Sequence, residues 1–330
     1  MRIRILKPGL MSTIQDLGRY QFISQAVPVS GAMDRLSARM ANKALDNRDN
    51  AAVIEFTYAD AAFIAETDLL ISYAGDGSIL TSGEHQLPAG RPLFIPSGTI
   101  IKLTNTLSGS RIYLAVAGGW DVPEVLGSKS TYLAAGFGGL DGRALQRGDI
   151  LKNEQRLTDS TKRILKSLKG DKVNYPRWSI AGQSFLPADR KTIRVVRGNE
   201  FDWFDGLSIT IFLSTSYVIG RQSNRMGYHL EGANLARLKK GELLSSAVVP
   251  GTIQVTGSGN MVLLMADCQT TGGYPRIAQV AAVDMPLCAQ LKPGDSFFFK
   301  EISRHEAEML YIEREQQLQQ LTIAVQSKFL

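Results

Sequence analysis

Short apolar runs, separated at close intervals by glycine, proline, asparagine and serine, recur along this 330-residue chain. Each run has the length of one strand, and the close spacing of turn residues favours antiparallel sheets over alternating strands and helices. The runs lie at 52–58, 69–73, 92–95, 100–104, 111–116, 209–213, 252–255, 262–266 and 296–299. We therefore expect a mainly β protein built from closed or nearly closed antiparallel barrels.

Two stretches have the pattern of helices instead. In the first, near residues 34–46, Leu36, Met40 and Ala44 fall on one helical face, and Asp34 or Ser37 can cap its start. The second stretch, at residues 301–330, is rich in Glu and Gln and predicts a C-terminal helical tail.

Several motifs occur twice in the same order, which indicates an internal duplication. The matched pairs are 3–5 with 193–195, 96–100 with 249–253, 117–120 with 271–274, and 145–149 with 291–295. The helix near 34–46 falls where the first copy is longer, so it reads as an insertion. We expect a first barrel at 1–155, a basic linker at 156–190, a second barrel at 191–300 and the tail at 301–330.

Charge and composition narrow the class of protein. Lysine and arginine exceed aspartate and glutamate by six (37 against 31), but ten of the basic residues lie between Lys152 and Lys191, and no aromatic residues interleave a basic stripe elsewhere. We expect no nucleic-acid partner. The start of the chain does not resemble a signal peptide, and no apolar run reaches the length of a membrane span, which predicts a cytoplasmic protein without a membrane contact.

The two cysteines, Cys268 and Cys288, predict no chemistry. They are far apart and have no nearby histidine pair, so we expect two buried thiols and no metal site.

Polar loop segments carry the candidate chemistry. Residues 13–20 and 27–34 contain Ser30 and Asp34, where backbone N–H groups and a carboxylate can converge at a helix start; a plain turn with Asp34 as cap is the alternative. In segment 223–232, the fork of Arg225 suits a carboxylate or phosphate, or it can instead lock its own loop by binding carbonyl groups.

The other two segments follow apolar strands in the second half of the chain. Segment 265–275 supplies hydroxyl, amide and glycine groups that suit a small polar ligand, and a wide turn is its alternative. Segment 242–254 can place the Gln254 amide beside it. The predicted ligand contacts are Ser30 of the early segment and, here, Gln254, Gln269, Thr270, Thr271, Gly272, Gly273 and Tyr274. No nucleophile triad, phosphate-binding loop or metal-ligand spacing is present in the sequence, which predicts a binding cleft that another protein completes.

These segments resemble one family over about residues 3–299. The runs TIQDLGR (13–19), VPVSGAMD (27–34), SNRMGYHLEG (223–232), VVPGTIQV (248–255) and QTTGGYPRIAQV (269–280) are similar to the family of 5-oxoprolinase C subunits, also called KipA-like or allophanate hydrolase subunit 2-like. The resemblance implies two cyclophilin-like β-barrels and a biotin-dependent carboxyltransferase relationship.

The resemblance also implies a function in a complex. Family members hydrolyse 5-oxo-L-proline to L-glutamate at the expense of ATP, together with KipI-like and LamB/YcsF-like partner proteins. It places Asp34 and Arg225 in a catalytic role and Gln254, Gln269, Thr271 and Tyr274 around the lactam. The sequence departs from the family pattern at Tyr20-Gln21, Cys268 and His229.

Two alternatives remain open at this point. A carboxyltransferase acting on urea or an amide would need biotin, carried on a separate protein because the chain has no Met-Lys-Met motif. A KipA-type regulator would bind a KipI-like kinase inhibitor, and its cleft would not be needed for catalysis.

Overall fold

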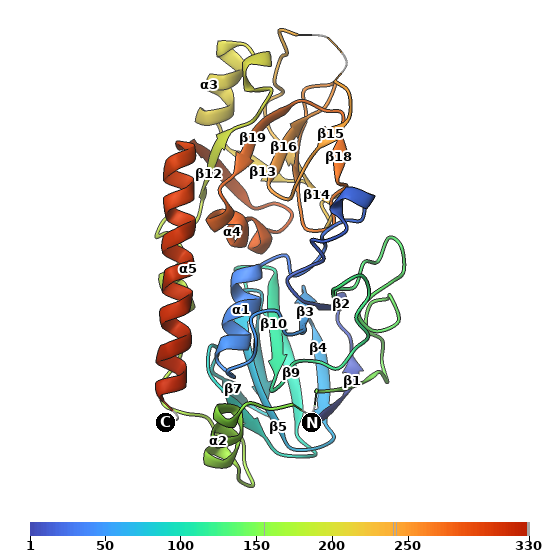
Figure 1. Ribbon diagram of the computed structural model, residues 1–330, viewed down its shortest axis with the longest axis vertical. Coiled ribbons are helices and arrows are strands. Elements are labelled where there is room, and N and C mark those ends of the chain that lie inside the picture. Colours follow the sequence, from blue (N-terminus) through green and yellow to red (C-terminus); the bar gives the residue numbers. More distant parts are fainter. Residues whose placement is uncertain (155, 240, 242, 329–330) are drawn as a thin grey trace. The chain divides into compact units, whose positions relative to one another are not determined.

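The computed structural model describes residues 1–154, 156–239, 241 and 243–328 (Figure 1). Its contacts divide the chain into two compact units, neither of which is one continuous stretch of sequence. Unit 1 consists of Met1–Gly18, Asp34–Phe185 and Gln316–Leu330; unit 2 consists of Arg19–Met33 and Leu186–Glu315. The boundaries predicted after residues 155, 190 and 300 stay a prediction, and residues 155 and 329–330 lie outside the described part.

Unit 1 holds two sheets around one hydrophobic core. The six-stranded sheet has the order β11 (Ile150–Lys152), β1 (Arg2–Lys7), β4 (Ala61–Ala65), β9 (Ile100–Asn105), β6 (Ser78–Ser82), β7 (His85–Leu87). The five-stranded sheet has the order β2 (Met11–Gln15), β3 (Val53–Thr57), β10 (Arg111–Val116), β5 (Leu69–Gly75), β8 (Leu93–Ile95). Apolar side chains from both sheets, such as Phe63 and Ile54, share this core. The described strands of unit 1 thus form two sheets where a closed or nearly closed barrel was expected.

The five-stranded sheet turns one face to the hydrophobic core, and its other face carries both apolar and polar side chains. Successive side chains of a strand point to opposite faces, so Ile54 and Ile112 enter the core while Glu55 and Tyr113 face the other way. Helix α1 (Arg35–Lys43), which lies where a helix was predicted, contacts β5 and β10 (Figure 1). Asp34 begins it by accepting a hydrogen bond from the Ser37 backbone N–H.

The region predicted as a basic linker contains regular structure that belongs to unit 1. Helix α2 (Asp159–Leu168) begins at Thr158, whose hydroxyl accepts from the Thr161 N–H at 3.0 Å, and the Thr161 hydroxyl donates to the Leu45 carbonyl at 2.9 Å. A short 3₁₀ helix, η2 (Gly182–Phe185), follows. The lysines and arginines of this region therefore belong to a folded segment.

Unit 2 contains a closed seven-stranded barrel. Its order is β12 (Thr192–Arg197), β19 (Arg276–Val280), β16 (Thr252–Val255), β17 (Met261–Leu264), β14 (Gly227–Glu231), β13 (Tyr217–Ile219), β20 (Ser296–Glu301). A small ribbon pairs β15 (Ser246–Ala247) with β18 (Thr271–Gly272). The core includes Ile193, Ile253 and Phe297 from the strands and Met33 from the N-terminal segment. The mainly β prediction is confirmed, and one barrel is closed.

Several helices complete unit 2. They are η1 (Ile23–Gln25), η3 (Phe201–Trp203), α3 (Gly206–Ser214), η4 (Ala282–Asp284) and α4 (Met285–Gln290). The strand predicted at 209–213 was wrong, because this segment is part of α3. Asp205 accepts from the Ser208 N–H at 2.6 Å, and Ser208 and Phe212, one turn apart, are both buried. The cap and the i, i+4 burial outweigh the strand preference of isoleucine and threonine.

The predicted C-terminal helix is present as α5 (Arg304–Ser327). Its residues up to Glu315 belong to unit 2 and those from Gln316 to unit 1. No helix in the described parts of the chain has the length and apolar composition that crossing a bilayer requires.

The duplicated motifs include one turn that recurs in detail. Asp149 and Asp295 each accept, through Oδ2, from the N–H three residues earlier, at 2.7 and 3.0 Å. The opening strands pair differently, however: β1 is antiparallel to β11, whereas β12 is parallel to β20 and β13 takes the antiparallel place. By pairing, the strand that corresponds to β1 is β13.

Candidate functional site

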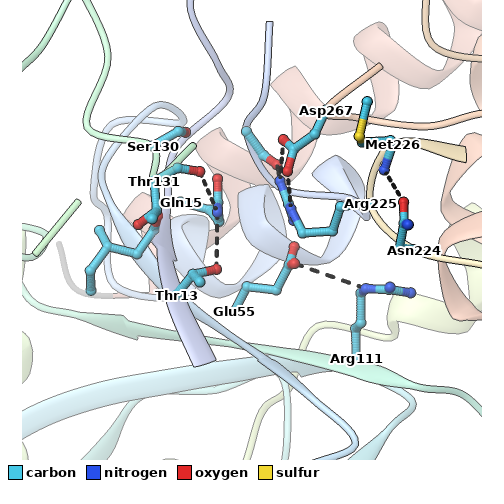
Figure 2. A network of polar contacts seen from close by, with 12 residues as sticks. Thr13, Gln15, Glu55, Arg111, Ser130, Thr131, Asn224, Arg225, Met226 and Asp267 are labelled. Carbon is cyan, nitrogen blue, oxygen red and sulfur yellow. Dashed lines mark hydrogen bonds and ion pairs between the residues drawn. The ribbon is translucent and has the colours of Figure 1, made fainter. Parts of the chain in front are cut away.

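Arg225 and Asp267 form a buried ion pair in unit 2 (Figure 2). Arg225 Nε and Nη2 donate to the two carboxylate oxygens of Asp267 at 2.8 and 3.0 Å. The two residues meet because β14 and β17 are antiparallel, and the ladder continues past both strands through the bond from Asp267 N to the Arg225 carbonyl at 2.8 Å. Such a fork satisfies both charges inside the protein, where an unpaired one would be costly.

The same guanidinium binds the N-terminal segment of unit 2. Arg225 Nη2 donates to the Gly31 carbonyl at 2.6 Å. Ser30 and Gly31 have φ values of 55° and 88°, a left-handed backbone that glycine accepts and serine adopts rarely. Arg225 therefore ties segments 27–34, 223–232 and 265–275 together, in the loop-locking arrangement that was the alternative to a ligand contact.

The predicted polar loop of unit 2 lies on the surface. Gln269, Thr271 and Gly273 are exposed, and Tyr274 is 51% exposed. Thr270 is buried, and its carbonyl accepts from the Val248 N–H at 3.0 Å. Hydroxyl, amide and phenol groups are thus presented side by side on a loop held at both ends by strands.

Gln254 lies beneath this loop. Its side chain is buried, and Nε2 donates to the Tyr274 carbonyl at 3.3 Å. A Cβ atom on Gly272 would lie 2.5 Å from the same Nε2, so a larger residue here would have to displace the Gln254 amide. The structure brings Gln254 beside segment 269–274 as expected, while Glu242 of segment 242–254 lies outside the described residues.

Asp34 is buried in unit 1 and serves the start of α1. Its Oδ1 accepts from the Ser37 N–H at 2.9 Å and its Oδ2 from the Ser37 hydroxyl at 2.6 Å. Its own N–H donates to the Tyr113 hydroxyl at 2.7 Å, which in turn donates to Glu55 Oε2 at 2.8 Å. Burial raises the pKa of Tyr113 well above its ordinary value, and the charges of Glu55 and Asp34 add to that effect. Tyr113 therefore stays protonated as a link between helix and sheet.

Further polar residues share the same sheet face. Arg111 Nε lies 3.9 Å from Glu55 Oε1, and both side chains are buried (Figure 2). Gln15 Nε2 donates to Thr13 Oγ1 at 2.9 Å and to the Thr131 carbonyl at 3.2 Å (Figure 2). This face therefore holds a group of buried polar side chains that a plain apolar core would not contain.

Asp16 anchors the segment that covers the edge of β2. Its Oδ1 accepts from the hydroxyls of Ser128 and Ser130 at 2.6 and 2.5 Å, and its Oδ2 from the Lys129 N–H at 2.7 Å. The Gly18 N–H is a further donor to Oδ1, at 2.8 Å. So many donors on one carboxylate indicate a structural role for Asp16.

Sequence reasoning missed Asp267, Glu55 and Arg111. A charged residue at a core-like position is a signal that could have found Glu55, since it interrupts the apolar run at 52–58. Asp267 gives no such signal, because its partner is 42 residues away in sequence. Among the described residues, no three His, Cys, Asp or Glu side chains come together in a way that would hold a metal ion.

Comparison with known proteins shows which family the chain resembles. The model of the "Carboxyltransferase domain, subdomain A and B" matches residues 25–301. The chain is 36% identical to the C subunit of 5-oxoprolinase from Escherichia coli K12 over 305 residues, which are 92% of this chain and 93% of that protein. It is 32% identical to the C subunit of 5-oxoprolinase from Haemophilus influenzae, over 99% of both chains.

A solved structure agrees with these matches. The crystal structure of the K. lactis urea amidolyase superposes with a TM-score of 0.85 at 27% identity. The match covers 97% of this chain and 20% of the amidolyase, so this chain spans about a fifth of that larger protein.

Proposed function

Because the chain belongs to the family of carboxyltransferase domains with subdomains A and B, we propose that it is the C subunit of an ATP-dependent 5-oxoprolinase. In this proposal it hydrolyses 5-oxo-L-proline to L-glutamate in the cytoplasm, together with KipI-like and LamB/YcsF-like partner proteins. ATP enters the reaction in the assembled complex. The finer fold prediction, two cyclophilin-like barrels from a duplication, belongs to this proposal and has the recurring Asp149 and Asp295 turns as its support.

One observation carries the choice of function. The chain matches the C subunits of two 5-oxoprolinases over nearly their whole length, whereas it matches only 20% of the urea amidolyase. The identity to those two C subunits, 36% and 32%, supports the same choice.

The surface loop of unit 2 supplies the groups that the reaction needs. A lactam carbonyl gains negative charge when water attacks, and fixed hydrogen-bond donors lower the energy of that state. Gln269, Thr271 and Tyr274 offer side-chain donors, and Gly273 beside Tyr274 is exposed. In this proposal Gln254 supports the loop from below, through its bond to the Tyr274 carbonyl.

In this proposal Arg225 acts by holding loops of unit 2, and Asp34 acts in unit 1 by beginning helix α1. Their hydrogen bonds run to Asp267, Gly31 and Ser37, which are protein groups. The catalytic role predicted for both therefore becomes a positioning role.

Exposed apolar side chains near the loop suit a partner protein. Met226, Val249 and Tyr274, which flank strands of the barrel, are 44%, 48% and 51% exposed. Side chains of this kind are enriched at protein–protein interfaces.

The test is a reconstituted assay of 5-oxoproline-dependent ATP hydrolysis with the purified KipI-like and LamB/YcsF-like partners. We expect turnover only when this chain is present. Thr271→Val and Tyr274→Phe, at exposed positions, should each raise KM or lower kcat without changing the melting temperature. Full turnover without this chain would overturn the proposal.

The carboxyltransferase alternative is favoured by the fit to the urea amidolyase at a TM-score of 0.85. It predicts carboxyl transfer to urea from a separate biotinylated carrier and no use of 5-oxoproline. A regulatory protein would bind a KipI-like partner tightly, and the Thr271 and Tyr274 variants would leave that binding unchanged.

A further inference from the structure

Unit 1 contains a pocket that shares no residue with the candidate site. The residues that line it are Met1, Asp68, Asn153, Leu157, Leu165 and Lys169. Its volume is about 310 Å³, at the lower end of the roughly 300–1,000 Å³ that ligand pockets occupy. It therefore has room for a molecule of the size of an amino acid.

Helix α2 supplies the wall of the pocket that combines apolar and charged groups. Leu157 precedes the cap residue of the helix, Leu165 lies within it, and Lys169 follows its last residue. The Lys169 N–H donates to the Leu165 carbonyl at 3.0 Å, which fixes the backbone that carries the lysine. This wall thus offers two leucine side chains and, at the end of the helix, one ammonium group.

The Asp68 carboxylate carries the opposite charge. Its Oδ1 accepts from the Ser97 N–H at 3.1 Å, which orients the carboxylate, and its Oδ2 lies 3.9 Å from Lys169 Nζ. That separation exceeds the length of a hydrogen bond. The Lys169 and Asp68 side chains are 68% and 42% exposed, so a ligand from solvent can reach both charges.

The amide of Asn153, the other polar side chain of the pocket, is already bonded to the protein. Its Oδ1 accepts from the Met1 amino group at 2.7 Å, and its Nδ2 donates to the Ala117 carbonyl at 2.8 Å. Among the side chains that line the pocket, recognition of a ligand therefore depends on the charged pair and on the apolar groups.

We propose that this pocket of unit 1 binds a zwitterionic α-amino acid with an apolar side chain. The ligand carboxylate accepts from Lys169 Nζ, and the ligand ammonium donates to Asp68 Oδ2. The apolar side chain of the ligand lies against Leu157 and Leu165. The two charged groups of an α-amino acid are joined through one carbon atom, so they can lie side by side along the 3.9 Å between the two protein groups.

The opposite charges of the pair select for a ligand that carries both charges. A ligand with only a carboxylate meets the like charge of Asp68, and a ligand with only an ammonium meets that of Lys169. In a zwitterion each charge lies next to its opposite, so both contacts are attractive. The lactam nitrogen of 5-oxoproline is an amide and not an ammonium, so this inference does not rest on the proposed function.

The test is an NMR titration of the full chain, labelled with carbon-13 in its leucine methyl groups. We expect L-leucine to shift the methyl signals of Leu157 and Leu165. Two related probes lack one charge each: 4-methylpentanoate has no ammonium, and 3-methylbutylamine has no carboxylate. Each should bind about tenfold more weakly than L-leucine, because one charged hydrogen bond is lost. Equal affinity for all three probes would overturn the proposal.

Variants of the charged pair test the same contacts from the side of the protein. Lys169→Met and Asp68→Asn should each weaken L-leucine binding about tenfold at an unchanged melting temperature, and asparagine can still accept from the Ser97 N–H. The matched controls are Lys166→Met and Asp171→Asn, at exposed positions that do not line the pocket. Both controls should bind L-leucine as the wild type does.

The remaining outcomes are also decisive. L-leucine that leaves the methyl signals of Leu157 and Leu165 unshifted, or a loss of affinity that is equal in variants and controls, would overturn the proposal. A failure of 5-oxoproline-dependent turnover in the reconstituted assay would overturn the proposed function and leave this binding site unaffected.

Discussion

At the scale of single residues, unit 2 is held by arginine forks on buried carboxylates. Asp267, Asp284 and Glu200 are each buried, and each accepts two hydrogen bonds from one guanidinium. Removing one partner of such a pair costs about 3–5 kcal/mol, because the other charge stays buried without compensation. The forks join loops to the barrel, so they fix where polar surface groups stand.

The thiol of Cys268, next to Asp267, gives a prediction at this scale. Burial, with a smaller effect of the Asp267 charge, raises its pKa to about 12, and burial raises the pKa of Cys288 as well. At pH 8 we expect neither thiol of the folded chain to react with a disulfide reagent, and both to react in guanidinium chloride. Rapid labelling of the folded protein would contradict this.

The same shift sets a dependence of stability on pH. The pKa of both thiols is higher in the folded chain than in the unfolded chain, where it is about 8.5. Their contribution to stability is therefore complete below about pH 8.5 and is lost as the pH rises toward the folded pKa. Urea denaturation at pH 7.5 and 10 should show a smaller pH effect in the double variant Cys268→Ser, Cys288→Ala.

At the scale of elements, helix and strand starts depend on single side chains. Asp34 begins α1, Asp205 begins α3, and Asp149 closes the turn before β11. Each carboxylate accepts from a backbone N–H three residues away in sequence, which is a local interaction. Local interactions of this kind can be predicted from sequence.

Substitutions of Asp34 test whether its carboxylate has a role besides beginning α1. Asp34→Ala should lower the free energy of unfolding by about 1 kcal/mol, and Asp34→Ser should restore it because serine caps as well as aspartate. We expect Asp34→Ser to keep turnover in the reconstituted assay. A stable but inactive Asp34→Ser variant would instead assign the carboxylate to catalysis.

Asp149 gives an acid-dependent prediction. The hydrogen bond from Arg143 is the main cause that lowers the pKa of Asp149. A carboxyl group with a lowered folded pKa adds stability above its unfolded pKa of about 3.9, and this stability is lost as the pH falls through the folded value. Asp149→Asn should therefore destabilise the chain more at pH 7 than at pH 2, as measured by thermal unfolding.

Local patterns predicted most elements, and long-range pairing explains the rest. The apolar runs at 52–58, 111–116 and 296–299 are strands, and the duplicated turn at Asp149 recurs at Asp295. The run at 209–213 is helical instead. The local signal for this helix is Asp205, which caps its start. Strand β1 is antiparallel to β11, whereas β12 is parallel to β20. Both pairings join residues that are far apart in sequence, and a single sequence does not reveal such pairings.

At the scale of the whole molecule, the chain enters each unit more than once. Unit 2 takes Arg19–Met33 from the early part of the chain, and α5 belongs to unit 2 in its first half and to unit 1 in its second. The candidate site follows this organisation. Arg225 and Asp267 belong to the stretch Leu186–Glu315, and the turn at Ser30 belongs to the stretch Arg19–Met33. The sequence indicated these segments, but it could not show that Arg225 binds protein groups.

Ending the chain after Glu315 tests the second half of α5. This change removes Thr322, whose hydroxyl accepts from Lys43 Nζ at 2.7 Å, and the buried Leu318 and Val325. Loss of the two apolar side chains should cost about 3–6 kcal/mol. Exchange should accelerate in α1, while β14 and β17 stay protected. A chain ending after Ser327 is the control, and equal melting temperatures of the two chains would refute the prediction.

The early position of Gly31 has a consequence for synthesis. Gly31 precedes the arginine that binds it by 194 residues, and a ribosome needs roughly 10–40 s to cover that length at about 5–20 residues per second. During this time the nascent segment at 19–33 lacks the barrel residues that it contacts in the folded chain. A gene fragment that starts at residue 186 would encode all seven barrel strands but not segment 19–33. A peptide with the sequence of 19–33 would have to be added in trans to complete unit 2.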